Sequence, residues 1–183
     1  MSFTNFTNGP IDRIGVKGPL IFNKSSFNLN WTDNPNETYY IQEYLPKGEK
    51  TERFNQMITI HLFNKGVLIK NAVQQKANEL ETRKTTDPIC NYQVTESPNG
   101  KEYMVDFILG ENQGNKSAIT EFNIYRYKQV DLAGKKGILV YAYTKRAYGD
   151  ESTAFLRNLK NERPVLLKTM AGTQIPAVKI SGK

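Results

Sequence analysis

The stretch from Thr38 to Phe63 constrains the fold more than any other part of the chain, because its pattern of apolar and polar residues changes twice within a short distance. Thr38–Leu45 is rich in Tyr, Ile and Leu and ends at the turn residues Pro46–Gly48, which is typical of a β-strand. Glu49–Asn55 has a capping residue and an inward aromatic, which predicts a short helix. Ile58–Phe63 alternates again and predicts a second strand. The stretch therefore indicates strand, turn, helix and strand in succession.

Two longer segments predict helices. Val67–Lys84 carries a modest apolar stripe at helical spacing and ends before Asp87-Pro88. Asp150–Ala171 has a second stripe, in which Pro164 predicts a kink or the start of another helix. The other patterned segments are extended, and four of them predict an antiparallel meander between the two helices. The predicted strands outside Thr38–Phe63 are Phe27–Trp31, Ile89–Glu96, Glu102–Leu109, Ser117–Gln129 and Gly137–Arg146. Ile11–Phe22, which Gly15 and Gly18-Pro19 interrupt, is expected to be an edge strand or an irregular ribbon.

This order of elements predicts an α+β fold rather than an alternating α/β fold. We expect an antiparallel β-sheet of about six strands, sandwiched with the central Val67–Lys84 helix and the C-terminal Asp150–Ala171 helix. A chain of 183 residues is long enough to bury a core of its own. Residues 1–183 are therefore expected to form a single domain, with residues 1–10 as a loose N-terminal lead-in.

One segment resembles a known family. Residues 40–49 read Tyr-Ile-Gln-Glu-Tyr-Leu-Pro-Lys-Gly-Glu, and Phe54 and Met57-Ile-Thr59 follow. This segment resembles the strand–turn–helix–strand unit of the bacterial PsbP-like, or Mog-type, α/β/α sandwich proteins. The resemblance implies a non-catalytic binding or assembly module, and many bacterial members are exported or lipid-anchored. It implies no ligand and no set of functional residues.

The chain is basic, with 25 Lys and Arg against 18 Asp and Glu and a formal net charge of +7. Such a charge suits nucleic acid or an acidic surface as a partner. The basic residues are spread along the chain, however, and the densest groups are the pairs Lys135–Lys136 and Lys145–Arg146. Lysines scattered over a solvated surface therefore explain the charge better, and a basic nucleic-acid binder is kept as an alternative.

Three side chains are candidates for catalysis. Cys90 is the single cysteine and His61 the single histidine, so the chain offers no intrachain disulfide and no multi-cysteine metal site. Asp106 lies in an apolar strand, where it either faces solvent or pairs with a base such as Arg126. No catalytic motif accompanies these residues, so we predict no enzyme, no cofactor and no metal site. A small hydrolase or isomerase that uses His61, Asp106 or Cys90 remains the enzymatic alternative.

Aromatic and basic residues gather on two strands that are expected to form a hairpin. Four tyrosines are expected on one face of this hairpin, with Arg126 and Lys128 on the other. Interfaces favour Tyr and Arg, while cross-strand tyrosine pairs also stabilise ordinary sheets. The candidate binding residues are Tyr125, Arg126, Tyr127, Tyr141, Tyr143 and Lys145.

The expected function is that of a non-enzymatic module that binds a protein or a small ligand. No apolar run reaches the roughly 18 residues of a membrane-spanning helix. The first residues, MSFTNFTNGP, lack the basic and apolar regions of an export signal. They fit either a cytoplasmic protein or a mature exported form that begins with a start Met. The resemblance favours a periplasmic or secreted location, with the cytoplasm as the alternative.

Overall fold

The computed structural model describes residues 9–113 and 116–180, without the side chains of residues 112–117. Most of the predicted lead-in, residues 1–8, lies outside the described part. The elements are β1 (Leu20–Phe22), β2 (Ser25–Asn36), β3 (Tyr39–Leu45), β4 (Gln56–Phe63), α1 (Ile69–Arg83), β5 (Asn91–Glu96), β6 (Glu102–Gln113), β7 (Lys116–Leu132), β8 (Lys135–Tyr148), a 3-10 turn (Gly149–Glu151) and α2 (Ser152–Gly172).

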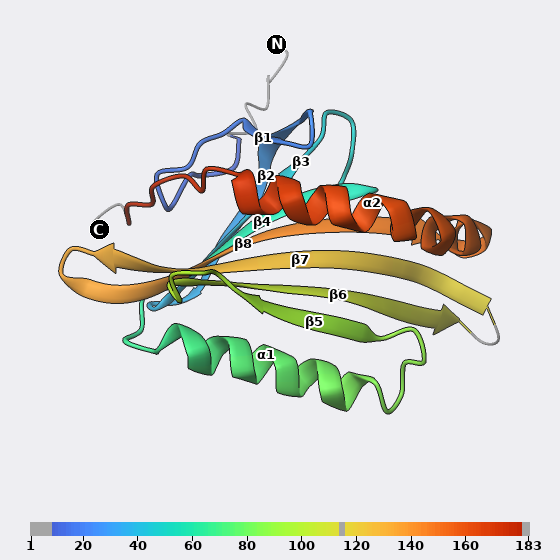
Figure 1. The fold of residues 1–183 in the computed structure, drawn as a ribbon. Helices are drawn as coiled ribbons and strands as arrows, with labels where there is room; N and C mark the ends of the chain where they lie inside the picture. The colour runs from blue at the N-terminus through green and yellow to red at the C-terminus, as the bar shows by residue number, and fades with distance from the viewer. Residues whose placement is uncertain (1–8, 114–115, 181–183) are drawn as a thin grey trace, which may run out of the picture.

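The strands form one antiparallel sheet of eight strands in the order β1-β2-β3-β4-β8-β7-β6-β5. The sheet curls into a half-barrel, with α1 and α2 on opposite sides of it (Figure 1). The predicted six-stranded α/β/α sandwich is therefore wrong. Long strands accumulate twist, which bends a sheet of this width instead of leaving it flat between helical layers. The glycine- and proline-interrupted segment before Asn23 also contributes a strand, because Leu20 pairs with Phe27.

The face of the sheet under α2 carries the larger core. α2 packs over β7 and β8 and buries Phe155, Leu159, Leu166 and Met170. The two chain ends close the same core, where the N–H of Lys179 donates to the carbonyl of Ile14 over 2.8 Å. Burial of one such apolar side chain contributes about 1.5–3 kcal/mol. Large apolar side chains therefore hold this face together.

α2 is one helix that continues through Pro164, so the predicted second helix is wrong. Proline removes one hydrogen bond within a helix, and buried Leu166 and Met170 keep the following turns on the sheet. Ion pairs also connect α2 to two strands, through Arg163–Asp106 on β6 and Lys145–Glu162 on β8. Arg126 on β7 donates hydrogen bonds to the carbonyls of Met170 and Thr173 and pairs with Glu102 on β6.

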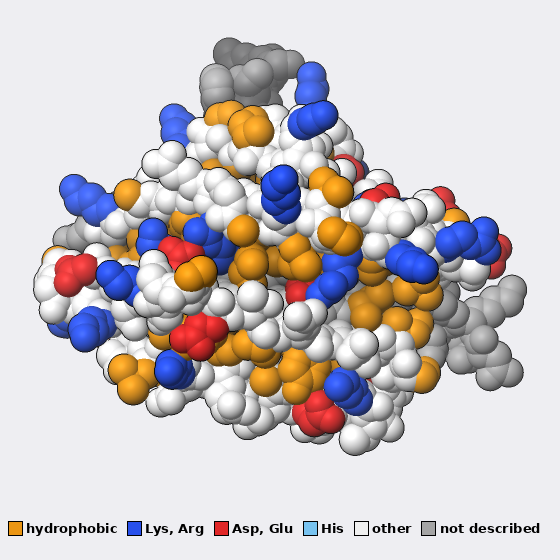
Figure 2. Space-filling model, viewed as in Figure 1, with side chains coloured by type: hydrophobic (Ala, Val, Ile, Leu, Met, Phe, Trp, Pro, Cys, Tyr) orange, Lys and Arg blue, Asp and Glu red, His pale blue; other side chains and the backbone are white. Residues whose placement is uncertain are grey.

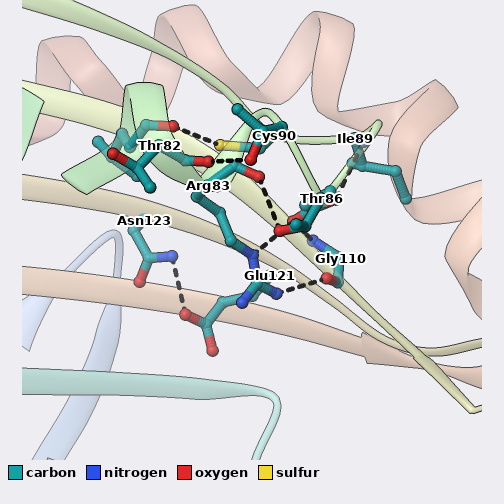
Figure 3. A network of polar contacts seen from close by, with 11 residues as sticks. Thr82, Arg83, Thr86, Ile89, Cys90, Gly110, Glu121 and Asn123 are labelled. Atoms are coloured by element: carbon teal, nitrogen blue, oxygen red, sulfur yellow. Dashed lines mark hydrogen bonds and ion pairs between the residues drawn. The ribbon is translucent and has the colours of Figure 1, made fainter. Parts of the chain in front are cut away.

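α1 packs across β5, β6 and β7 on the other face of the sheet, and a polar network fixes its C-terminal end (Figure 3). The Asp87 carboxylate, 4% exposed, accepts the N–H groups of Ile89 and Gly110 at 3.0 and 2.8 Å. Arg83 donates to the same carboxylate and, over 2.9 Å, to the carbonyl of Gly110. A Cβ atom at Gly110 would lie 2.9 Å from Ile89 Cδ1, so only glycine fits there without a shift.

The segment between β3 and β4 forms turns and no helix, so the predicted Glu49–Asn55 helix is wrong. The Glu49 carboxylate accepts the N–H groups of Asn55 and Gln56 at 2.7 and 3.2 Å, which ties the loop to the start of β4. Phe54 is 2% exposed and packs against the guanidinium of Arg146, 4.2 Å from its ring centre. The strand–turn–helix–strand unit that carried the PsbP-like resemblance therefore lacks its helix.

Candidate ligand-binding site

A groove of about 500 Å³ lies between the N-terminal half of α1 and the sheet. Its floor comes from four neighbouring strands, β3, β4, β8 and β7, and its wall comes from α1 and the preceding loop. The register brings the floor residues together, because His61 pairs with Val140 and Val140 pairs with Tyr127. The lining residues are Tyr39, His61, Phe63, Lys65, Val67, Ala72, Gln75, Lys76, Glu79, Tyr125, Tyr127, Ile138 and Val140.

Aromatic rings make up much of the floor. Tyr39 and Phe63 stack with ring centres 4.7 Å apart and an angle of 5°. Tyr125 meets the edge of Phe107 at 5.0 Å and lies 6.0 Å from the His61 ring. Stacked and edge-to-face rings stabilise one another, so this floor is a firm, flat and largely apolar surface.

The charged groups of the groove come from α1 and from Lys65 in the loop before it. Lys76 Nζ lies 5.5 Å from the ring centre of Tyr125 and 5.6 Å from that of Phe107. The same amine pairs with Glu79 over 2.9 Å. An ammonium group over aromatic faces is held by cation–π attraction. Lys76 therefore covers the aromatic floor and brings a positive charge to the apolar part of the groove.

His61 is the polar group at the centre of the groove. Its Nδ1 lies 2.8 Å from the hydroxyl of Tyr39. Burial lowers the pKa of His61 to about 4, and the charge of Lys76 adds to the shift. The ring is therefore neutral near pH 7, and Nε2 takes the opposite hydrogen-bonding role to Nδ1. Within the described part of the chain, Nε2 has no hydrogen-bond partner, and it is free to bond with a ligand.

The tyrosines of the groove stay neutral for the same reason. Burial raises the pKa of Tyr125 and Tyr127, and neighbouring acidic and phenolic groups add to the rise. Burial also raises the pKa of Tyr39, with Glu43 as the next cause. A neutral phenol both donates and accepts a hydrogen bond. The floor can therefore bind the polar edges of a ligand without placing a negative charge beside them.

The structure divides the six predicted binding residues between two faces of the sheet. Tyr125 and Tyr127 lie in the groove, whereas Tyr141 and Tyr143 are 1% exposed in the core under α2. Arg126 pairs with Tyr141 in the β7–β8 register and, like Lys145, reaches α2. The expectation that the four tyrosines share one face is therefore wrong.

The turn between β7 and β8 causes this division. The loop contains only Ala133 and Gly134, both with positive φ, as in the tight turns that suit hairpins. This loop pairs Tyr125 with Ala142 and Ile124 with Tyr143. Odd-numbered residues of β7 therefore face the same way as even-numbered residues of β8, because directly opposite side chains share a face.

The candidate catalytic residues do not meet. His61 faces α1, while Asp106 lies on the other face and receives two hydrogen bonds from Arg163 at 2.7 and 3.0 Å. Asp106 does not face solvent, because the side chain is 4% exposed. It pairs with a base, as one of the two alternatives expected, but the base is Arg163 and not Arg126. The thiol of Cys90 is buried and donates to the carbonyl of Leu80, and burial raises its pKa.

The sequence pattern indicated His61 as a catalytic candidate and did not indicate Tyr39, Phe63 and Lys76 as its neighbours. The available signal was the alternation of Ile58–Phe63, which puts His61 and Phe63 on one face. Among residues 9–113 and 116–180, no group of His, Cys, Asp and Glu side chains is arranged to hold a metal ion. In the same ranges, neither helix has the length and hydropathy needed to cross a membrane.

One protein-family model matches residues 14–175, which is most of the chain. The protein therefore belongs to this family, which is uncharacterised and names no function. No curated protein and no solved structure matches the chain. The family match does not bear on the PsbP-like resemblance.

Proposed function

We propose that this protein is a non-enzymatic binding protein and that the groove under α1 takes up a small ligand. The ligand has a flat apolar body that packs on Tyr39, Phe63 and Tyr125, and a polar group that bonds to His61 Nε2. One observation carries the proposal: an aromatic groove of about 500 Å³ contains the half-buried imidazole of His61, whose Nε2 is bonded by no described residue.

Size and chemistry support this function. Ligand pockets commonly have volumes of about 300–1,000 Å³ and combine apolar walls with a few polar groups. Lys65 and Lys76 line the groove, and among the described residues Lys76 pairs with one acid, Glu79. Lysine ammonium groups and a neutral imidazole together favour a carbonyl or an acidic group on the ligand. We therefore propose an aromatic carboxylate, sulfonate or ketone as the ligand class.

The alternatives receive less support. An enzyme with His61 and Asp106 as partners would need them on one face, and they lie on opposite faces. For a nucleic-acid binder, the arginines would need to be free, yet Arg126, Arg146 and Arg163 each pair with an acid. A periplasmic or secreted location stays part of the proposal, on the basis of the PsbP-like resemblance alone.

The test uses 8-anilinonaphthalene-1-sulfonate, a dye with an aromatic body and an acidic group, in a fluorescence titration of the full chain. Ala72→Phe fills the groove from α1, and we expect at least about a tenfold loss of affinity. Gln74→Phe introduces the same side chain on the exposed side of α1 and is the matched control. Its affinity should stay within about twofold of the unmodified chain. Equal binding by both variants would overturn the proposal.

A further inference from the structure

The sheet ends at β5, and no described strand pairs with its outer edge. β5 pairs with β6 over all six residues from Asn91 to Glu96 without a bulge, and five of these residues are exposed. The strand contains no Pro and no Lys, which are features that edge strands commonly use against pairing with another chain. The opposite edge, β1, has only three residues. The N–H of Tyr92 donates to the side chain of Asn91 over 3.0 Å. The other outer N–H and C=O groups of β5 are open to an added strand.

Two hollows lie beside this edge on the α2 side of the sheet, with volumes of about 320 and 240 Å³. Figure 2 shows hydrophobic side chains exposed between α2 and β5, with Lys and Arg side chains along α2. The first hollow includes Gln93, Ile108 and Leu159, and the second includes Thr95, Met104 and Ala171. The hollows are thus partly apolar and open toward the edge of the sheet.

Arg163 bridges α2 and β5 at the first hollow. Its Nη2 donates to Gln93 Oε1 over 2.8 Å, and its Nε donates to Asp106. Its Nη1 has no hydrogen-bond partner in the part of the chain that the structure describes. α2 carries four basic residues and one acid, Glu162, which pairs with Lys145. The charges of α2 therefore complement an acidic partner.

We propose that β5 and α2 form a docking surface for an extended acidic segment of a partner protein, which adds to the sheet along β5. Main-chain hydrogen bonds to a sheet edge supply affinity, and pockets for alternate side chains supply specificity. In this segment, alternate side chains face α2: an apolar one at each hollow, and an acidic one between them beside Arg163. A second copy of β5 fits less well, because its own α2-facing side chains are the polar Asn91, Gln93 and Thr95.

The probe is a fluorescein-labelled peptide with the order threonine, leucine, threonine, glutamate, threonine, leucine, threonine. This order puts both leucines and the glutamate on one face of a strand. The control peptide has the same composition with the two leucines adjacent, so that they face opposite ways. By fluorescence anisotropy with the full chain, we expect the probe to bind about tenfold more tightly than the control.

Two proline variants test the role of the edge itself. Val94→Pro and Thr95→Pro are neighbours, and their N–H groups point in opposite directions because the backbone alternates along a strand. The variant whose N–H faces outward should have a melting temperature close to that of the unmodified chain, and it should bind the probe about tenfold more weakly. The other variant removes a bond to β6 and should melt at a lower temperature.

Amide hydrogen exchange on the unmodified chain gives a second measurement, which needs no variant. Probe binding should slow exchange at alternate residues of Asn91–Glu96. Three results would overturn the proposal: equal binding of the two peptides, no probe binding at millimolar concentration, or slowed exchange in the α1 groove instead of β5. Dimerisation through β5 in sedimentation, abolished by the outward-facing proline, would also overturn it in favour of a second copy.

Discussion

The two helices cover the same sheet in different ways. α2 buries five side chains, forms ion pairs with β6 and β8, and accepts a hydrogen bond from Arg126 of β7 near its C-terminal end. α1 buries only Val73, Ala77 and Leu80, and its polar anchor lies at its C-terminal end. The N-terminal end of α1 has no side-chain cap, and Val67 and Leu68 beside it are exposed.

This difference separates a packed core from an open groove. On the α2 side, aliphatic and aromatic side chains form the larger core, and the hollows lie at its margin beside β5. The α1 side is held at one end and open at the other, where His61 and the aromatic floor are reachable. Segments with few buried apolar contacts are also the ones that open most readily. We therefore expect stability to depend mainly on α2 and ligand binding mainly on α1.

The largest expected effect tests this division with the same substitution in both helices. Leu166 and Leu80 are 2% and 3% exposed. Leu→Ala substitutions in cores cost about 2–5 kcal/mol, depending on how far the site can collapse. We expect about 4 kcal/mol for Leu166→Ala, because it lies in the larger core, and about 2 kcal/mol for Leu80→Ala, because α1 buries only three side chains and encloses its site less completely. Urea unfolding measures both, and equal losses would contradict the comparison.

The next effect concerns pH and is specific to the α1 side. The pKa of His61 is about 4 in the folded protein and about 6.5 when unfolded. The unfolded state therefore binds the proton first, and the stabilisation present above pH 6.5 is lost as the pH falls toward 4. When the pH is lowered from 7 to 4, the free energy of unfolding should fall by about 3 kcal/mol more for the unmodified chain than for His61→Gln. The titratable groups around the ring include Lys76 and Glu79 from α1 and Tyr39 and Tyr125 from the sheet. Parallel stability curves for the two proteins would contradict this assignment.

The smallest effect concerns the anchor of α1. Asp87→Ala leaves the buried N–H of Gly110 without its acceptor, which should cost about 2 kcal/mol. Asp87→Asn keeps an acceptor oxygen and should cost less than the alanine variant. Amide exchange should accelerate at the C-terminal end of α1 and leave α2 unchanged. A similar acceleration in α2 would show that the two helices are held as one unit.

Sequence patterns located most of the elements. The strand predicted at Thr38–Leu45 is confirmed as Tyr39–Leu45, and the helix predicted at Val67–Lys84 is confirmed as Ile69–Arg83. These segments follow from side-chain periodicity, which is local. The prediction of a short helix at Glu49–Asn55 failed for two reasons. The Glu49 carboxylate binds N–H groups at the end of the loop, and Phe54 is buried against Arg146, which is distant in the sequence.

The chain's sequence thus determined its strands, its two long helices and the aromatic character of β7 and β8. Only the tertiary structure decided which strands meet, since β4 pairs with β8 across a long separation in the chain. That pairing places His61 beside Val140, and the two-residue turn at Ala133-Gly134 directs Tyr125 into the groove and Tyr141 into the core. Periodicity assigns residues to a face of their own strand, but the register between strands decides which faces combine.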